Sequence, residues 1–225
     1  QSPDDHVALG RTFTSVDRLW ITVTTGATLI GVAVAPSVIR GWLGGGFGLA
    51  GVFAAMLIAA YGSNLLFGVR ISYLRARGSG SLEARLAVLL IALNLALTVP
   101  LAIIFGAGGV VAGTLLAYLL GAGWFTLRFR DHAPEIKDRS AGTLTKAALW
   151  GVLFALVGGA IAALAASAIP VGWALVVILV VTAVALAGFL ACALSIRPTL
   201  AGVRSWRSDF ADQFAARASS TTQSP

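Results

Sequence analysis

Six uncharged apolar stretches run along the chain, separated by short polar segments. They cover residues 19–39, 48–69, 86–104, 109–127, 147–168 and 172–196. A helix of about 20 residues crosses a hydrocarbon core of roughly 30 Å, and each stretch is near that length. Because backbone groups in hydrocarbon must be paired within their own segment, such continuous runs predict helices and exclude the alternating strands of a barrel.

The composition favours the same all-α membrane class. Hydrophobic residues make up 58% of the chain and charged residues 11%, whereas roughly a quarter of a soluble domain is charged. The net charge of +7 raises the possibility of a nucleic-acid partner, but such a partner needs basic residues gathered on one soluble face. Here they lie between the apolar stretches, so we expect topology-setting charge and no nucleic acid.

The loop charges predict a cytoplasmic N-terminus and C-terminus. With this threading, only Arg40 of the 16 lysines and arginines falls outside, a strong case of the positive-inside rule. Tryptophan prefers the headgroup level of a membrane. The predicted span ends carry Trp20, Trp42, Trp124, Trp150 and Trp173.

After the last stretch, apolar residues recur at spacings of three or four. They are Leu200, Val203, Trp206, Phe210 and Phe214. This pattern predicts a C-terminal amphipathic helix lying in the inner interface, with a partner-docking helix as the alternative. Residues 219–225 read as a disordered tail. The predicted fold is thus a polytopic all-α membrane protein with six transmembrane helices and an interfacial C-terminal helix.

Neither an enzyme nor a cofactor site is expected. The single cysteine, Cys192, and the two histidines, His6 and His132, provide neither a disulfide framework nor a zinc site. The phosphate-binding loop, the paired-histidine zinc motif and the nucleophile elbow are all missing from the sequence.

The predicted spans contain few polar residues and no ionisable ones. Tyr61, Ser63 and Asn64 cluster in the second span, and Asn94 lies in the third. The sequence leaves two roles open for these residues: they form hydrogen bonds between helices, or they line a substrate path. Without an intramembrane charge, ion coupling is not expected within this chain, and the apolar lining suits lipid tails.

The fourth span has a small residue at every fourth position: Gly109, Gly113, Ala117 and Gly121. Residues four apart share a helix face. The stripe therefore predicts close packing against another helix.

Two stretches resemble the C-terminal part of polysaccharide exporters in the multidrug/oligosaccharidyl-lipid/polysaccharide (MOP) exporter superfamily. The first reads VAVAPSVIRGWLG over residues 32–44 and is followed by Phe47. The second contains NLAL at 94–97, Pro100, FGAGG at 105–109, Thr114 and Tyr118. They are similar to the family's proline-containing helix with a glycine outer turn, and to its asparagine-bearing helix, outer turn and small-residue helix. The likeness covers about residues 10–130.

The resemblance implies a two-lobed flippase of the bacterial plasma membrane that moves a lipid-linked oligosaccharide by alternating access. Residues 19–127 would form four helices of the second lobe, and 147–196 an appended helix pair. Residues 1–18 and 128–146 would be cytoplasmic, and 197–225 the amphipathic helix and tail. The first lobe, which would bind the pyrophosphate, would be missing, and the absence of Met before Gln1 also suggests a piece of a longer protein.

The expected partners are membrane lipid, a lipid-linked glycan and the missing N-terminal lobe. Polar candidates near a substrate path are Arg18, Arg40, Asn64, Arg70 and Asn94. Two alternatives stay open: a non-transporting membrane subunit or scaffold that packs against a partner, and a drug/ion antiporter of the same superfamily. The second alternative needs a carboxylate at membrane depth, which the predicted spans lack.

Overall fold

A computed structural model of the chain describes residues 3–133 and 140–194, and these are helical apart from short turns. The elements, in chain order, are α1 (Pro3–Leu43), the short 3-10 helix η1 (Gly45–Phe47), α2 (Gly48–Leu65), α3 (Gly68–Ala76), α4 (Ser81–Phe105), α5 (Ala107–His132), α6 (Ser140–Ala168) and α7 (Trp173–Leu194).

Six helical segments are long and apolar enough to cross a membrane. They are Phe13–Leu43, Gly45–Ala76, Ser81–Phe105, Ala107–His132, Gly142–Ala168 and Trp173–Ala193. The prediction of a multi-pass, all-helical membrane protein is confirmed at this level. The amphipathic helix predicted within residues 197–225 lies outside the described residues.

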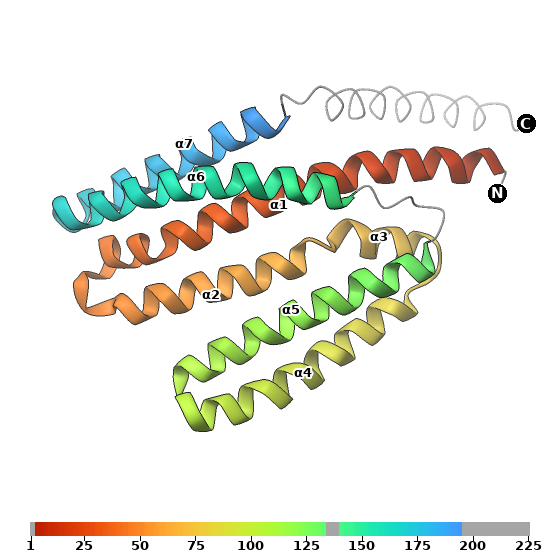
Figure 1. Ribbon diagram of the computed structural model, residues 1–225, viewed down its shortest axis with the longest axis horizontal. Coiled ribbons are helices and arrows are strands. Elements are labelled where there is room, and N and C mark those ends of the chain that lie inside the picture. The colour runs from red at the N-terminus through yellow and green to blue at the C-terminus, as the bar shows by residue number, and fades with distance from the viewer. Residues whose placement is uncertain (1–2, 134–139, 195–225) are drawn as a thin grey trace, which may run out of the picture.

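The six spans run antiparallel to their chain neighbours and lie in an open row, with α2 and α3 following one another in the second span (Figure 1). In this row α1 packs against α2, α6 and α7, α2 packs against α5, and α5 packs against α4. The N-terminal end of α1 and the C-terminal end of α7 point in the same direction along the helix axes.

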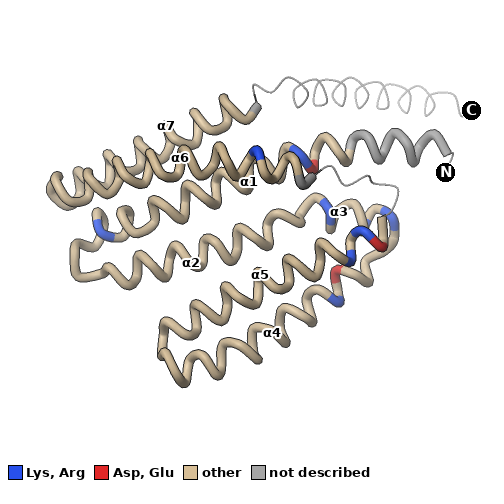
Figure 2. Tube along the Cα trace, in the orientation of Figure 1, with Lys and Arg blue, Asp and Glu red and all other residues tan. Residues whose placement is uncertain are grey.

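Charge is concentrated at the tips of the helices on the side where α3 lies (Figure 2). Arg40 stands in the last turn of α1, at the opposite end, next to the turn around Gly44. The other described lysines and arginines lie toward the α3 end. An asymmetry of this kind is the pattern that the positive-inside rule describes for neighbouring loops.

The helices α1, α5 and α6 extend beyond the predicted spans. Residues 1–18 were expected to precede the first span, but α1 is continuous from Pro3. Likewise α5 continues to His132 and α6 begins at Ser140, within the loop expected over 128–146. Hydrophobicity marks where a helix enters lipid, whereas a helix ends only where its hydrogen-bond ladder is interrupted.

The small-residue stripe of α5 forms its contact with α4. Gly109, Gly113, Ala117 and Gly121 are all buried. A Cβ added at Gly113 would lie 2.7 Å from the Thr98 Cα, and one at Gly109 would lie 1.8 Å from the Leu101 carbonyl oxygen. Only glycine permits these two backbones to approach so closely.

The turn that joins these two helices also depends on a glycine. Gly106 is the one residue between α4 and α5 and has φ of 59°, a left-handed conformation that residues with a Cβ adopt reluctantly. Its amide donates a hydrogen bond to the Ala102 carbonyl, which closes the end of α4.

Helix α4 forms the edge of the row. Apart from marginal contacts, its packing partner among the described residues is α5. Its apolar side chains are accordingly exposed, with Ile103 at 81% and Ile91 at 70%. This helix therefore presents a wide apolar surface to lipid or to another protein.

Candidate functional site

The second membrane span is interrupted near its charged end. Helix α2 ends at Leu65 and α3 begins at Gly68, whereas the sequence predicted one unbroken stretch over residues 48–69. At the break the Phe67 amide donates to the Asn64 carbonyl at 3.2 Å, a tighter turn than the α-helical pattern. The hydrophobicity of this stretch did not predict the interruption, although Gly62, Ser63 and Asn64 precede it and Gly68 follows it.

The Trp20 side chain of α1 supports the backbone at the break. Its indole N–H donates a hydrogen bond of 2.6 Å to the Leu65 carbonyl. Gly68, the first residue of α3, lies directly against the Trp20 ring, because a Cβ there would be 3.5 Å from the indole nitrogen. Broken helices are tolerated at membrane depth when a neighbouring helix pairs the released backbone groups. Trp20 has this role for Leu65.

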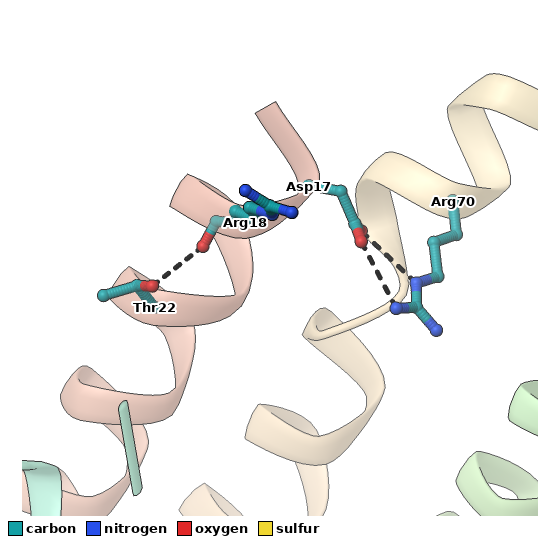
Figure 3. A network of polar contacts seen from close by, with 4 residues as sticks. All are labelled: Asp17, Arg18, Thr22 and Arg70. Carbon is teal, nitrogen blue, oxygen red and sulfur yellow. Dashed lines mark hydrogen bonds and ion pairs between the residues drawn. The ribbon is translucent and has the colours of Figure 1, made fainter. Parts of the chain in front are cut away.

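A buried ion pair lies beside the break and joins α1 to α3 (Figure 3). The Arg70 guanidinium donates to both carboxylate oxygens of Asp17, from Nε at 3.3 Å and from Nη2 at 3.2 Å. Both residues are 5% exposed. The two-pronged geometry matches the fork of a guanidinium to a carboxylate, and the low dielectric strengthens the attraction.

Aromatic rings surround the pair and add α5 to the assembly. The Phe129 ring lies 5.2 Å from the Arg70 guanidinium carbon, within the range of a cation–π contact. The Phe13 ring packs against Tyr73 at 4.4 Å and against Phe129 at 6.2 Å between centroids. The ion pair and these rings thus hold α1, α3 and α5 together at the charged end of the helices.

Arg18 follows Asp17 on α1 but does not bond to the pair. Its carbonyl accepts a hydrogen bond from the Thr22 hydroxyl at 2.8 Å (Figure 3). Its Nε atom is buried and has no hydrogen-bond partner among the described residues. A buried guanidinium nitrogen without a partner is costly, which marks this position as one that a ligand or another chain can satisfy.

The other predicted candidates are spread over the molecule. Asn64 lies at the break, close in sequence to Arg70. Arg40 is exposed at the far end of α1. Asn94 lies between α4 and α5, where its side-chain oxygen accepts a hydrogen bond from Thr98 at 2.7 Å. The structure therefore gathers Arg18, Asn64 and Arg70 near the break and leaves Arg40 and Asn94 elsewhere.

Sequence reasoning missed Asp17, because it precedes the first apolar stretch and was assigned to a cytoplasmic segment. One signal points to it. Asp17 and Arg70 lie at similar chain distances on either side of the turn at residues 44–47, and an antiparallel helix pair brings such positions to similar depth. The described residues hold no group of three or more His, Cys, Asp or Glu side chains suited to a metal.

Comparison of the chain with protein families, curated proteins and solved structures finds no match in any of the three.

Trp20→Phe tests the support of the broken helix. Phenylalanine keeps most of the ring packing but removes the indole N–H, so the Leu65 carbonyl loses its donor. We expect a loss of about 1 kcal/mol in unfolding free energy, the usual net worth of one hydrogen bond, measured by denaturant unfolding in detergent. The control is Trp42→Phe, at the exposed C-terminal end of α1. Equal effects of the two substitutions would remove the role assigned to Trp20.

Proposed function

We propose that this chain is part of a membrane transporter that flips or exports lipid-linked oligosaccharide or polysaccharide precursors by alternating access. The observation that carries the proposal is the interrupted second span, with its ion pair at the break. Interrupted transmembrane helices occur in transporters, where one segment can move against another. Here the interruption lies near the charged end of the span, where α3 can move against α1.

The open row supports an incomplete transporter. Helix α4 has one substantial neighbour and exposes most of its apolar side chains, as expected for the edge of a lobe that meets lipid on one side and a second lobe across a path. We propose that the second lobe lies upstream in a longer protein, as the resemblance to MOP exporters implies. On this proposal, the whole lies in a bacterial plasma membrane with both termini cytoplasmic.

The ion pair has a structural part in the proposed cycle. Because Arg70 is bonded to Asp17 and both are buried, the pair is not free to bind a coupling ion or a pyrophosphate. It instead holds α3 against α1, and its opening would release α3 to move. This arrangement also argues against the drug/ion antiporter, because the Asp17 carboxylate is already neutralised by a guanidinium.

A non-transporting membrane subunit is the second candidate, favoured by the exposed face of α4. Such a subunit would bury this face against a stoichiometric partner. It would then purify with that partner and retain no lipid-linked sugar.

The proposal is tested in cells that lack the gene for this chain. Inner-leaflet lipid-linked sugar is measured by its accessibility to an impermeant sugar-oxidising reagent, with right-side-out and inside-out membranes compared. We expect the lipid-linked sugar to accumulate on the cytoplasmic leaflet and to return to its ordinary distribution when the gene is restored. An unchanged distribution would contradict the proposed transport.

A further inference from the structure

Uncharged polar side chains form a row across α2, α5 and α4. We define this polar row as Asn64, Tyr61, Tyr118 and Asn94. The rings of Tyr61 and Tyr118 pack against each other, with centroids 5.3 Å apart. From α5, Thr114 lies on the same face as Tyr118, and its hydroxyl is 3.5 Å from the Asn94 side-chain oxygen. Contacts therefore link the three helices through these residues.

Three residues of the row lie near the middle of their spans. Tyr61 is close to the centre of the span Gly45–Ala76, Asn94 to that of Ser81–Phe105, and Tyr118 to that of Ala107–His132. Membrane transporters place their substrate sites near the middle of the bilayer. Asn64 lies at the break, toward the ion pair, and so forms the end of the row.

The amides in the row have unused hydrogen-bonding groups. The Asn94 oxygen accepts from Thr98, but among the described residues no acceptor pairs its amide nitrogen. The Asn64 side chain likewise has no hydrogen bond within the described part of the chain. An unpaired amide in an apolar medium costs roughly 2–7 kcal/mol. A lipid environment for this face is therefore unfavourable, whereas water or a polar ligand would satisfy both amides.

The rest of the exposed surface of α5 is different in kind. Leu119 follows Tyr118 directly, roughly 100° around the helix, and is 48% exposed. The exposed leucines Leu116, Leu120 and Leu127 lie on the face opposite Tyr118. Leucine side chains suit lipid tails. Tyr61, in contrast, is 52% exposed and carries a hydroxyl group.

We infer that the polar row lines a hydrated path through the membrane and binds an uncharged, hydroxyl-rich group. Phenol and carboxamide groups both donate and accept hydrogen bonds, as hydroxyl groups require. Aromatic faces pack against the apolar C–H surface of a sugar ring. The row carries no charge to attract an ion. The choice of ligand rests on the proposed function, whereas the hydration of the face does not.

Hydration is tested by cysteine accessibility. In a Cys192→Ala background, single variants Tyr61→Cys, Tyr118→Cys and Leu119→Cys are made in the full-length protein and treated in native membranes with a charged methanethiosulfonate reagent. Only the thiolate reacts, and an apolar environment disfavours it. We expect Tyr61→Cys and Tyr118→Cys to react at least about tenfold faster than Leu119→Cys, because burial of a charged form in hydrocarbon is so costly.

Reaction at equal rates at Tyr118→Cys and Leu119→Cys would overturn the inference. Labelling after denaturation gives the total thiol for each variant, so a poorly expressed variant does not imitate a shielded one. A small effect of Tyr118→Phe on unfolding, set beside fast labelling of Tyr118→Cys, separates a path-lining residue from interhelical packing.

The ligand class is tested by protection of Tyr118→Cys. Octyl glucoside and octyl sulfate share one alkyl chain and differ in head group, and both are added below their micelle-forming concentrations. At the half-saturating concentration we expect octyl glucoside to slow labelling about twofold and octyl sulfate to leave it unchanged. Equal protection by both would contradict binding of a hydroxyl-rich group. If Tyr118→Cys labels fast but cells that lack the gene show no defect in flipping, the proposed function is rejected and the hydrated face stands.

Discussion

Replacing Asp17 by alanine is expected to lower the unfolding free energy by about 3–5 kcal/mol, because it leaves the buried Arg70 guanidinium without its counterion. Both residues are almost fully buried, and Arg70 donates two hydrogen bonds to the carboxylate. The cost arises less from the lost attraction than from the unpaired charge that remains in an apolar surrounding. Unfolding is measured in detergent by denaturant titration.

A double variant separates these two causes. In Asp17→Leu/Arg70→Met both charges are removed and apolar volume is largely kept, so we expect the stability to return close to that of the wild type. The control is Arg75→Ala, which breaks the exposed pair between Arg75 and Glu83 at the α3–α4 turn and should change stability little. A double variant as unstable as Asp17→Ala would contradict the buried-charge explanation.

Gly113→Leu is expected to separate α4 from α5. A Cβ at Gly113 meets backbone atoms of Thr98 at 2.7 and 2.8 Å, and backbone cannot move aside as a flexible side chain can. Overpacking of this kind costs about 1–3 kcal/mol, and here α4 has no other substantial neighbour to keep it in place. We expect a disulfide-trapping pair across the α4–α5 contact to lose most of its cross-linking.

Gly123→Leu is the matched control on the same helix. A Cβ at Gly123 meets nothing within 4 Å, so the added side chain enters open space on the exposed face of α5. It should leave cross-linking and unfolding unchanged. If the two glycine variants behaved alike, the close approach of α4 and α5 would not be what stabilises their pairing.

The positions of the membrane spans could be predicted from the sequence because they depend on length and hydrophobicity alone. Runs such as residues 86–104 and 109–127 fall inside α4 and α5, and the glycines between them mark the turn that joins these helices. The face of α5 that meets α4 was also readable, because Gly109 and Gly113 recur with the helical period. These are local properties, carried by one segment at a time.

The break between α2 and α3 could not be predicted in the same way. No proline or glycine stands between Asn64 and Phe67 to interrupt the helix. The interruption is compensated by Trp20 on another helix, through a hydrogen bond that joins residues 45 positions apart. A feature stabilised by tertiary contact leaves no local pattern.

Only part of the candidate site could be predicted from the sequence, because the site too depends on tertiary contacts. Arg70 was selected as a polar residue at a span end, but its partner Asp17 was not, because 53 positions separate them. The row of Tyr61, Tyr118 and Asn94 also depends on which helices are neighbours. Their residue types suggested either packing or a substrate path, and the cysteine labelling described above tests which of the two applies.

The most direct test of the account is the sidedness of three loop positions in the intact membrane. Gly46, Gly80 and Gly142 are each replaced by cysteine in the Cys192→Ala background, since a side chain at any of them meets no other atom within 4 Å. Labelling uses an impermeant maleimide on right-side-out and inside-out vesicles. Six crossings predict that Gly80→Cys and Gly142→Cys react from the same side and Gly46→Cys from the other. Reaction of Gly80→Cys and Gly142→Cys from opposite sides would contradict the six-span membrane fold.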